Sequence, residues 1–412
     1  ARAIAGEAHV LFTESPGGAV ATAARVTRLR PLIDAAVAGT SLDPDLLEGL
    51  VFVESAGRPD AVAGNDPSNA AGLTQILPST ATSLLGLRVD LAASRKLTAQ
   101  IARAQGNGAS SSAIAALERR RARVDERFDP RRALAGAVRY LELADARFGR
   151  EDLAVVTYHM GMGNLSHVLD LYDGGRPVPY VQLFFDSSPD HNPRTFALLS
   201  GFLDQSSLYY WRVLGAVEIM RMYRSDPAGL ARLAALQTAT DSAAEVLHPP
   251  DHTPTLATPA ALQAAYARGT LTPLPANAAQ LGLSYSGSIG DLARQLKAPA
   301  GLYRGLQPVA LTLLLELAAR VKALSGGQAP LRVTSAVSDE RYQQLVGVAD
   351  PPAAAGWSFT IARAYVGEPQ RQALQAMLDR LQALNLIAWE RFSSEIEVTV
   401  AGDAARVIAA GP

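Results

Sequence analysis

The stretch that most constrains the fold covers residues 43–81, and it begins with a helix that carries an acidic residue on its apolar face. Asp43 is a typical N-cap and Pro44 a typical first helical residue, so the sequence predicts a helix over 44–55. Gly57 is expected to end it. One face of this helix follows i, i+3, i+4, i+7 spacing and consists of Leu47, Leu50, Val51 and Glu54. A carboxyl group therefore completes an apolar stripe.

Glu54 admits two interpretations. If the side chain is buried, desolvation raises the pKa of its carboxyl group, which then stays protonated near neutral pH. A protonated carboxyl group in a cleft can act as a general acid. Alternatively, Glu54 turns out to water or pairs with Arg58 at the helix end and has no chemical role. The spacing alone leaves both interpretations open.

Four segments, in order along the chain, carry a resemblance to a known family. Residues 54–58 read Glu-Ser-Ala-Gly-Arg, and residues 71–81 read Ala-Gly-Leu-Thr-Gln-Ile-Leu-Pro-Ser-Thr-Ala. Residues 154–165 contain Tyr-His-Met-Gly-Met-Gly-Asn, and residues 209–214 read Tyr-Tyr-Trp-Arg-Val-Leu. Together they resemble the motifs of the soluble lytic transglycosylase (SLT) domain, a lysozyme-like fold related to goose-type lysozyme. The resemblance implies a mainly helical domain that acts on peptidoglycan.

The first two segments supply three site residues by this resemblance. Glu54 corresponds to the acid and base of the family, and Ser55 lies beside it. Gln75 is expected to help line the sugar cleft. A turn-rich loop over 60–71 separates the two segments and is expected to return the chain toward Glu54.

The last two segments supply the remaining candidates. Tyr158 matches a family tyrosine that lies near the catalytic carboxyl group. His159 stands where the family usually has asparagine, which puts one sugar contact in doubt, although an imidazole can also donate one hydrogen bond and accept another. Tyr209 is the candidate for a late cleft tyrosine, and Tyr210 is the alternative in a shifted register.

The resemblance also implies an unusual mechanism. A glycosidase usually needs two carboxyl groups, whereas the SLT route uses only Glu54, assisted by the N-acetyl group of the substrate, and yields a 1,6-anhydromuramyl end. No cofactor and no metal ion are expected. A hydrolytic muramidase of the same fold is the alternative, with Asp60 or Asp66 as second carboxylate. A non-catalytic peptidoglycan-binding scaffold is the other alternative.

Composition excludes several other classes of protein. The chain has 412 residues, of which 48% are hydrophobic, and a formal net charge of -1, so it is long enough for two or three domains and has no general positive charge for nucleic acid. No run of about twenty apolar residues is present, so no membrane span is expected. The absence of cysteine excludes disulfides and thiol catalysis.

The sequence predicts four parts. Residues 1–18 are expected to be a lead-in and residues 19–235 the lysozyme-like helical domain. Residues 236–300 are rich in proline, alanine and threonine and are expected to form a linker. Alternating helical and strand patterns over 301–412 predict a smaller α+β domain.

This last domain resembles the hedgehog/DD-peptidase fold of D-Ala-D-Ala carboxypeptidases, which hold a zinc ion with histidine and aspartate. Ala353 and Thr360 occupy the positions of the first two ligands in this sequence. Residues 394–398 carry glutamates where the later histidine would stand, and no histidine or cysteine follows His252. The resemblance therefore implies a degenerate, metal-free domain that binds or braces.

An arginine-rich helix is predicted over 112–128. Its basic residues could form a face for acidic muramyl peptides or anionic wall polymers, but interleaved acids favour a solvated helix. The expected partners are peptidoglycan glycan strands and no nucleic acid, with cell-wall, divisome or secretion proteins as possible partners of the C-terminal domain. The substrate implies an extracytoplasmic location, whether secreted, wall-associated or periplasmic. Because the first residue is Ala1, a signal sequence is expected to have been removed.

Overall fold

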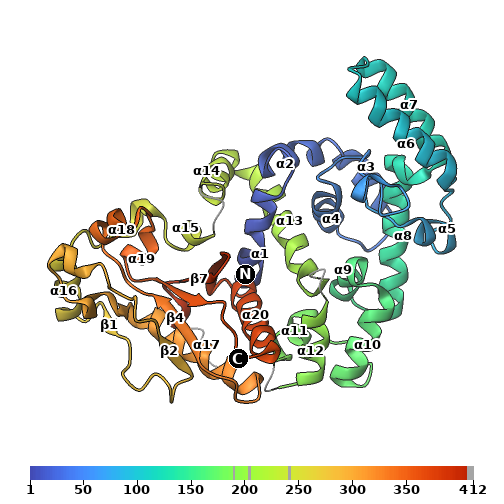
Figure 1. Cartoon of the computed structure of the whole chain (residues 1–412). Coiled ribbons are helices and arrows are strands. Elements are labelled where there is room, and N and C mark those ends of the chain that lie inside the picture. The colour runs from blue at the N-terminus through green and yellow to red at the C-terminus, as the bar shows by residue number, and fades with distance from the viewer. Residues whose placement is uncertain (189–190, 203–205, 240–242, 406–412) are drawn as a thin grey trace. The chain divides into compact units, whose positions relative to one another are not determined.

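The computed structural model describes residues 1–188, 191–202, 206–239 and 243–405. The chain divides into two compact units, which we call the helical unit (Val10–Ala234) and the mixed unit (Ala1–His9 with Ala235–Pro412) (Figure 1). Residues 406–412 at the end of the predicted α+β domain lie outside the described residues. The division agrees with the expected fold class, a helical domain followed by a smaller α+β region.

The helical unit is built from α-helices joined by short turns and 3-10 segments. Helix α1 (Arg2–Thr13) and helix α14 (Pro227–Gln237) cross the boundaries between the units. The α-helices between them are α2 (Ala19–Thr27), α3 (Arg30–Val37), α4 (Pro44–Ser55), α5 (Pro78–Ser83), α6 (Leu91–Gly106), α7 (Ser111–Val124), α8 (Pro130–Phe148), α9 (Glu151–Met160), α10 (Met162–Asp173), α11 (Tyr180–Asp186), α12 (Pro193–Gly201) and α13 (Tyr209–Ser225).

Helix α4 has the predicted bounds, and its ends follow local rules. The Asp43 carboxylate accepts a hydrogen bond from the backbone N–H of Asp45 at 2.8 Å. At the other end Ala56 and Gly57 both adopt positive φ, 53° and 71°, which stops the helix. The middle of α4 packs against α13 so closely that a Cβ on Gly49 would lie 2.8 Å from the carbonyl oxygen of Val213. This contact fixes Glu54, one turn further on, relative to α13.

The N-terminal part of the helical unit differs from the sequence prediction. The alanine-rich pattern of residues 19–38 predicts one helix, but these residues form two, α2 and α3, because the chain turns at Arg28 and Leu29. Residues 1–18, which lack periodicity and are expected to be a lead-in, contain helix α1, and the aromatic ring of Phe12 is buried. Burial of this apolar side chain stabilises the folded segment, although the sequence shows no helical periodicity there.

The mixed unit contains a five-stranded sheet in the order β2-β4-β5-β7-β6. Strand β2 pairs with β4 in parallel, and the other neighbours are antiparallel. The strands are β1 (Thr272–Pro273), β2 (Leu283–Tyr285), β3 (Gly305–Leu306), β4 (Leu331–Ser335), β5 (Ser358–Ala362), β6 (Ile387–Arg391) and β7 (Glu395–Val400), and the α-helices are α15 (Ala244–Leu247), α16 (Pro259–Ala267), α17 (Pro308–Leu324), α18 (Glu340–Val346), α19 (Pro351–Ala354) and α20 (Glu368–Ala383).

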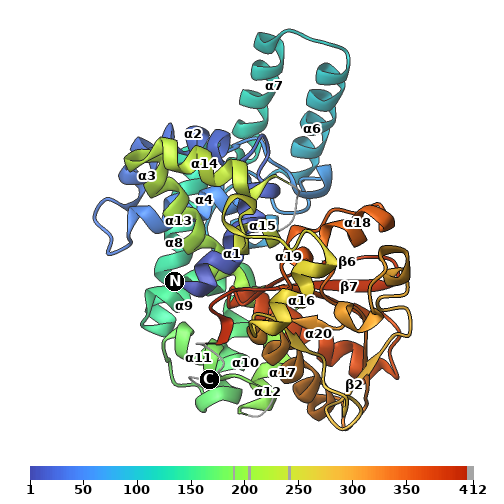
Figure 2. The same cartoon turned by 90° about the vertical axis from the view of Figure 1, so that its left-hand side faces the viewer.

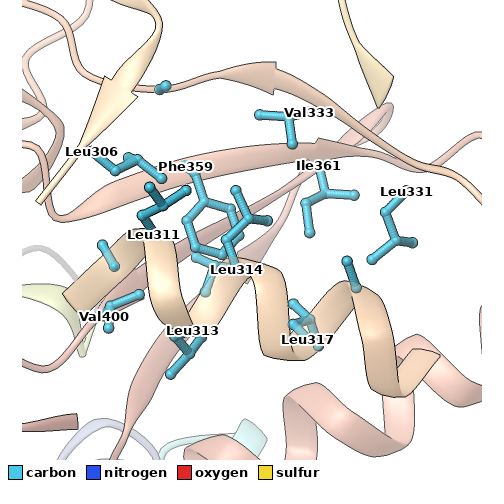
Figure 3. Packing of buried hydrophobic residues seen from close by; sticks show 14 of the residues in the cluster. Leu306, Leu311, Leu313, Leu314, Leu317, Leu331, Val333, Phe359, Ile361 and Val400 are labelled. Carbon is cyan, nitrogen blue, oxygen red and sulfur yellow. The ribbon is translucent and has the colours of Figure 1, made fainter. Parts of the chain in front are cut away.

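The core of the mixed unit lies on one face of this sheet. Leu314 and Leu317 of α17 point toward Phe359 and Ile361 of β5, and all four side chains are almost completely buried (Figure 3). Strand β7 alternates in the same way, because Ile396, Val398 and Val400 are buried while Glu395 and Glu397 face the other side. The opposite face of the sheet is therefore polar.

The prediction of a linker over 236–300 is wrong, because this segment folds as part of the mixed unit. Leu262, Leu271 and Leu283 are buried in the core, and β2 adds a strand to the edge of the sheet. Pro259 starts helix α16. Pro250 and Pro259 occupy the first positions of short helical segments, where a backbone N–H is not needed, and Pro273 lies in the two-residue strand β1.

Candidate active site

Glu54 lies in the last turn of α4, and its carboxyl group is held by a tyrosine. The hydroxyl group of Tyr209, the first residue of α13, donates a hydrogen bond of 2.6 Å to Oε1 of Glu54. Arg58, the other partner considered for Glu54, donates instead to the carbonyl oxygen of Ser55. Glu54 is half-buried and therefore neither turns freely to water nor pairs with that arginine.

The surroundings of Glu54 raise its pKa. Burial is the larger cause and raises the pKa to about 7, while the hydrogen bond from Tyr209 acts in the opposite direction by stabilising the carboxylate. Neither cause is a second carboxylate. The group therefore exchanges between acid and base forms near neutral pH, which is the condition under which one residue can first give and then take a proton.

Tyr209 is itself held in place by neighbouring side chains. Its ring stacks on the imidazole of His159, with the ring centroids 5.1 Å apart and an angle of 25° between the planes. Nδ1 of His159 lies 2.9 Å from Oγ of Ser206. The pKa of Tyr209 is raised well above its usual value by burial and by the charge of Glu54, so the phenol remains a hydrogen-bond donor.

Tyr158 approaches the same carboxyl group from α9. Burial and the charge of Glu54 raise the pKa of Tyr158 well above its usual value. Its hydroxyl group donates to the carbonyl oxygen of Thr74 at 2.9 Å, and its ring meets that of Tyr140 edge-on at 5.2 Å. Tyr158 thus links α9 to the loop that follows α4.

The side chains of Gln75 and Ser55 both make hydrogen bonds to the backbone near Glu54. Gln75 has a positive φ of 47°, and its side-chain N–H groups donate to the carbonyl oxygens of Gly72 at 2.8 Å and Ala61 at 3.3 Å. Ser55 is 2% exposed, and its hydroxyl group donates back to the carbonyl oxygen of Val51 at 3.3 Å. Both side chains stabilise the backbone around Glu54 in this structure.

The two tyrosines at the start of α13, Tyr209 and Tyr210, contact different partners. Tyr209 meets Glu54, whereas the ring of Tyr210 packs edge-on against Tyr180 and Trp211, at centroid distances of 5.9 Å and 5.0 Å. Consecutive residues on a helix point about 100° apart, so only one of them can face α4. The structure therefore places Tyr209, and not Tyr210, at the carboxyl group.

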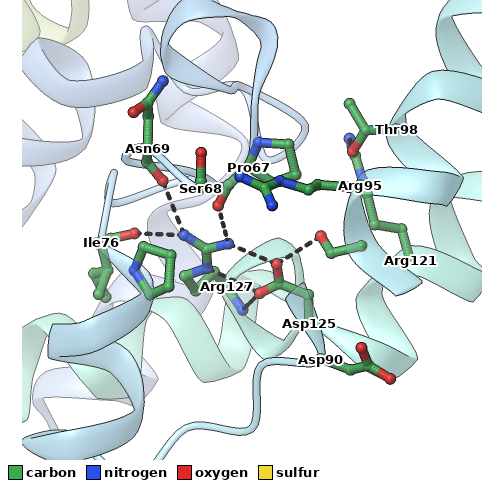
Figure 4. A network of polar contacts seen from close by, with 12 residues as sticks. Pro67, Ser68, Asn69, Ile76, Asp90, Arg95, Thr98, Arg121, Asp125 and Arg127 are labelled. Atoms are coloured by element: carbon green, nitrogen blue, oxygen red, sulfur yellow. Dashed lines mark hydrogen bonds and ion pairs between the residues drawn. The ribbon is translucent and has the colours of Figure 1, made fainter. Parts of the chain in front are cut away.

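A buried ion pair that the sequence did not indicate holds the loop in front of Glu54. Arg127 is fully buried, and all five of its guanidinium N–H donors are used (Figure 4). Two bind the carboxylate of Asp125, at 2.9 Å and 2.7 Å. The other three bind backbone carbonyl oxygens of the loop at 2.7 Å, 3.0 Å and 3.0 Å, those of Pro67, Asn69 and Ile76.

This ion pair corrects the prediction of a solvated arginine-rich helix. Arg127 is 0% and Arg121 is 3% exposed, so two of the arginines belong to the interior. The guanidinium group of Arg121 lies over the ring of Phe128 at 3.7 Å and donates to Oγ1 of Thr98 at 3.1 Å. A run of charged residues gives no periodic signal that separates buried from exposed members. Only the contacts between distant residues do so.

Gly72 is required where this loop crosses the buried pair. Its φ is +80°, and a Cβ there would lie 1.8 Å from the carbonyl oxygen of Arg127. No side chain fits at that distance, because the obstacle is backbone. The loop between α4 and α5 therefore passes directly over Arg127 before it reaches Gln75.

The two alternative carboxylates lie in this loop and are differently placed. Asp66 accepts hydrogen bonds from Nε of Arg95 at 3.0 Å and from the N–H of Ser68 at 2.9 Å, and these lower its pKa to about 2. Asp60 is exposed and lies near enough to Arg121 to favour the charged guanidinium. Among the described residues, no cluster of three histidine, aspartate or glutamate side chains could hold a metal ion.

Comparison with known families identifies part of this unit. Residues 31–98 match the family model of the transglycosylase SLT domain, a stretch that includes Glu54, Ser55 and Gln75. No curated protein matches the chain. The family match supports a lysozyme-like domain with a peptidoglycan-degrading function of the lytic transglycosylase type, and agrees with action on the cell wall. In the described part of the chain no helix is long and apolar enough to cross a membrane.

Proposed function

We propose that the helical unit is a peptidoglycan lytic transglycosylase with Glu54 as its single acid and base. It would cleave the β-1,4 bond between N-acetylmuramic acid and N-acetylglucosamine and leave 1,6-anhydromuramyl ends. The observation that carries the proposal is the half-buried carboxyl group of Glu54, whose pKa is raised to about 7 by burial against the opposing effect of the hydrogen bond from Tyr209, and not by a second carboxylate. The SLT match over residues 31–98 gives the substrate class.

In the first step, the protonated carboxyl group of Glu54 gives its proton to the glycosidic oxygen as the bond from that oxygen to C1 of the muramyl residue breaks. The carbonyl oxygen of the substrate's N-acetyl group stabilises the positive charge at C1. In the second step, the muramyl 6-hydroxyl oxygen bonds to C1, and its proton returns to Glu54. The hydrogen bond from Tyr209 stabilises the carboxylate between the two steps.

The other site residues position the glycan and the acid in this proposal. Tyr209 and His159 form a stacked pair beside Glu54, with the imidazole exposed for contact with a sugar. Tyr158 and Gln75 set the position of the loop through the carbonyl oxygens of Thr74 and Gly72. Ser55 acts on the substrate only through the backbone of α4, because its side chain is buried.

The hydrolytic alternative predicts a different result at the loop carboxylates. Asp66 is bound by Arg95 and, with a pKa of about 2, is a weak base for activating water. Replacing both Asp60 and Asp66 by asparagine is expected to change the rate of fragment release from purified peptidoglycan by no more than about threefold. A loss of about 100-fold or more, of the size that general-base catalysis supplies, would support the muramidase instead.

Tyr209→Phe tests the electrostatics of the acid. The hydrogen bond from Tyr209 lowers the pKa of Glu54, so its removal raises that pKa further. Because the first step needs the protonated acid, the alkaline fall in kcat is expected to move to higher pH, and kcat at its maximum to decrease. Steady-state cleavage measured between pH 5 and pH 9 checks this. Tyr210→Phe is the matched control and should leave the profile in place; a shift of the Tyr209→Phe profile to lower pH contradicts the assignment.

For the mixed unit we propose a non-catalytic role in binding or bracing. Ala353 and Thr360 stand where a zinc peptidase of the resembled fold has ligands, and the side chain of Ala353 is buried in the short helix α19. In the sheet Thr360 is the register partner of Glu397. Methyl and hydroxyl groups at these positions do not form a zinc site of the peptidase kind.

A further inference from the structure

Helices α6 and α7 form a hairpin with an unusual charge. Residues 91–124 contain seven arginine or lysine residues and one acidic residue, in a chain whose net charge is -1. The two helices stand side by side and extend away from the remainder of the helical unit in both views (Figures 1 and 2). Helix α6 has 16 residues and is therefore about 24 Å long. The positive charge is thus gathered on one projecting element.

Most of these cations are not used by the fold. Arg121 is buried over Phe128, and Arg95 pairs with Asp66 at 3.0 Å. Five basic residues remain, all of them exposed: Lys96, Arg103, Arg119, Arg120 and Arg123. Within the described part of the chain, no ion pair includes any of these five. Arg103 donates only to the carbonyl oxygen of Ala99 in its own helix, at 3.1 Å. Like charges gathered on one element without an ion-pair partner carry an electrostatic cost that binding of an anion would relieve.

The base of the hairpin is tied rigidly to the candidate active site. Ser94 of α6 donates to the carboxylate of Asp125 at 2.7 Å, and Asp125 follows α7 directly. The same carboxylate holds Arg127, whose other donors fix the loop that carries Gln75 (Figure 4). The base of the hairpin is therefore connected through Asp125 and Arg127 to the loop that carries Gln75.

We propose that this basic hairpin binds the peptide stems of peptidoglycan through their carboxylates, as a substrate-holding arm of the transglycosylase unit. The choice of partner rests on the proposed function, because the peptide stems are the negative charges that accompany the glycan to Glu54. The family match ends at residue 98, inside α6, so α7 lies beyond the matched residues. The arm gives this chain a means of preferring peptide-bearing glycan over bare glycan.

The chemistry of the hairpin favours this partner over single-stranded nucleic acid and lipid surfaces. Residues 91–124 contain no phenylalanine, tyrosine or tryptophan. Stacking of aromatic rings on bases is characteristic of single-stranded nucleic acid binding, and aromatic side chains anchor proteins at lipid interfaces. A surface of cationic side chains alone suits fixed, exposed carboxylates.

The test compares native peptidoglycan with peptidoglycan whose stem carboxylates have been converted to amides with carbodiimide and ammonia. Binding of the full chain carrying Glu54→Gln is measured by co-sedimentation at low and high salt. Amidation is expected to weaken binding about tenfold at low salt, and 0.5 M sodium chloride to remove most of the difference between the two polymers. Equal binding to native and amidated peptidoglycan overturns the proposal without any variant of the hairpin.

A matched pair of variants locates the effect. In one, five glutamines replace the exposed cations Lys96, Arg103, Arg119, Arg120 and Arg123. In the control, five glutamines replace exposed arginines elsewhere, Arg176, Arg194, Arg221, Arg268 and Arg371. Only the hairpin variant is expected to bind native peptidoglycan as weakly as the amidated polymer; equal losses in both variants, or a preference for phosphatidylglycerol vesicles over native peptidoglycan, contradict the proposal.

These experiments test the proposed binding by the hairpin and the proposed cleavage independently of each other. The binding measurement uses a chain without its acid, so it does not depend on turnover. Carboxylate-independent binding overturns the arm even if the wild-type chain releases anhydro fragments. Carboxylate-dependent binding together with an absence of cleavage by the wild-type chain would support the arm and contradict the transglycosylase.

Discussion

Replacing Glu54 by glutamine is expected to lower the rate of fragment release from purified peptidoglycan by roughly 10²- to 10⁴-fold, the range that a positioned general acid supplies. The amide has the shape of the carboxyl group and can still accept the hydrogen bond that Tyr209 donates to Oε1. It cannot give a proton to the glycosidic oxygen or take one from the 6-hydroxyl group. Loss of turnover with retained binding of peptidoglycan is therefore the expected pattern, measured by release of soluble muropeptides and by co-sedimentation.

Two controls separate lost chemistry from lost structure. Glu142 is exposed on α8, and Glu142→Gln should leave the rate unchanged.

The fold of the Glu54→Gln chain is checked by thermal unfolding. The folded-state pKa of about 7 lies above the ordinary value of 4.5, so Glu54 costs stability progressively as the pH rises from 4.5 through 7. Glu54→Gln should then be more stable than the wild type above pH 7 and equal to it below pH 4.5. Undiminished turnover would contradict the role of Glu54.

Replacing Arg127 by methionine is expected to lower the free energy of unfolding of the helical unit by about 3–5 kcal/mol, which is typical when one partner of a buried ion pair is removed. The change leaves the carboxylate of Asp125 in the interior without its cation. It also leaves three carbonyl oxygens of the loop without donors, those of Pro67, Asn69 and Ile76. Turnover should fall as well, because this loop positions Thr74 and Gln75 beside Tyr158.

Urea unfolding followed by tryptophan fluorescence measures this loss. Trp211 is the tryptophan of the helical unit, and replacing Trp357 and Trp389 by phenylalanine makes it the reporter for that unit alone. Arg132→Met is the matched control, since Arg132 is 66% exposed and should change stability by less than about 0.5 kcal/mol. A loss below about 1 kcal/mol for Arg127→Met would show that the pair does not hold the loop.

The features of the site that follow from local rules could be predicted. The N-cap at Asp43 and the stop at Gly57 define α4, and helical spacing alone places Glu54 at the end of an apolar stripe. The stripe also explains why the carboxyl group is desolvated, because it ends beside side chains that pack on α13. Resemblance to the family motifs then added Tyr158 and Tyr209, and the structure brings both within reach of Glu54.

Other features depend on contacts between distant parts of the chain and had no local signal. Arg127 binds carbonyl groups about fifty to sixty residues earlier in the sequence, so its burial could not be read from its own surroundings. The choice between Tyr209 and Tyr210 depends on how α13 packs against α4. Ser55 is buried because its side of the helix faces the interior, whereas its neighbour Glu54 is half-buried. In the segment 236–300, frequent proline and alanine concealed the few leucines that join the core of the mixed unit.

In the reaction that we propose, one carboxyl group cuts the glycan and closes the anhydro ring without water as nucleophile. The most direct measurement is mass analysis of the soluble fragments that the wild-type full chain releases from purified peptidoglycan in water enriched in ¹⁸O. We expect muramyl ends in the 1,6-anhydro form that carry no ¹⁸O, and none of these fragments from Glu54→Gln. Newly formed reducing muramyl ends in place of the anhydro form, absent when the chain is left out, would contradict the proposed reaction, because water would then have attacked C1.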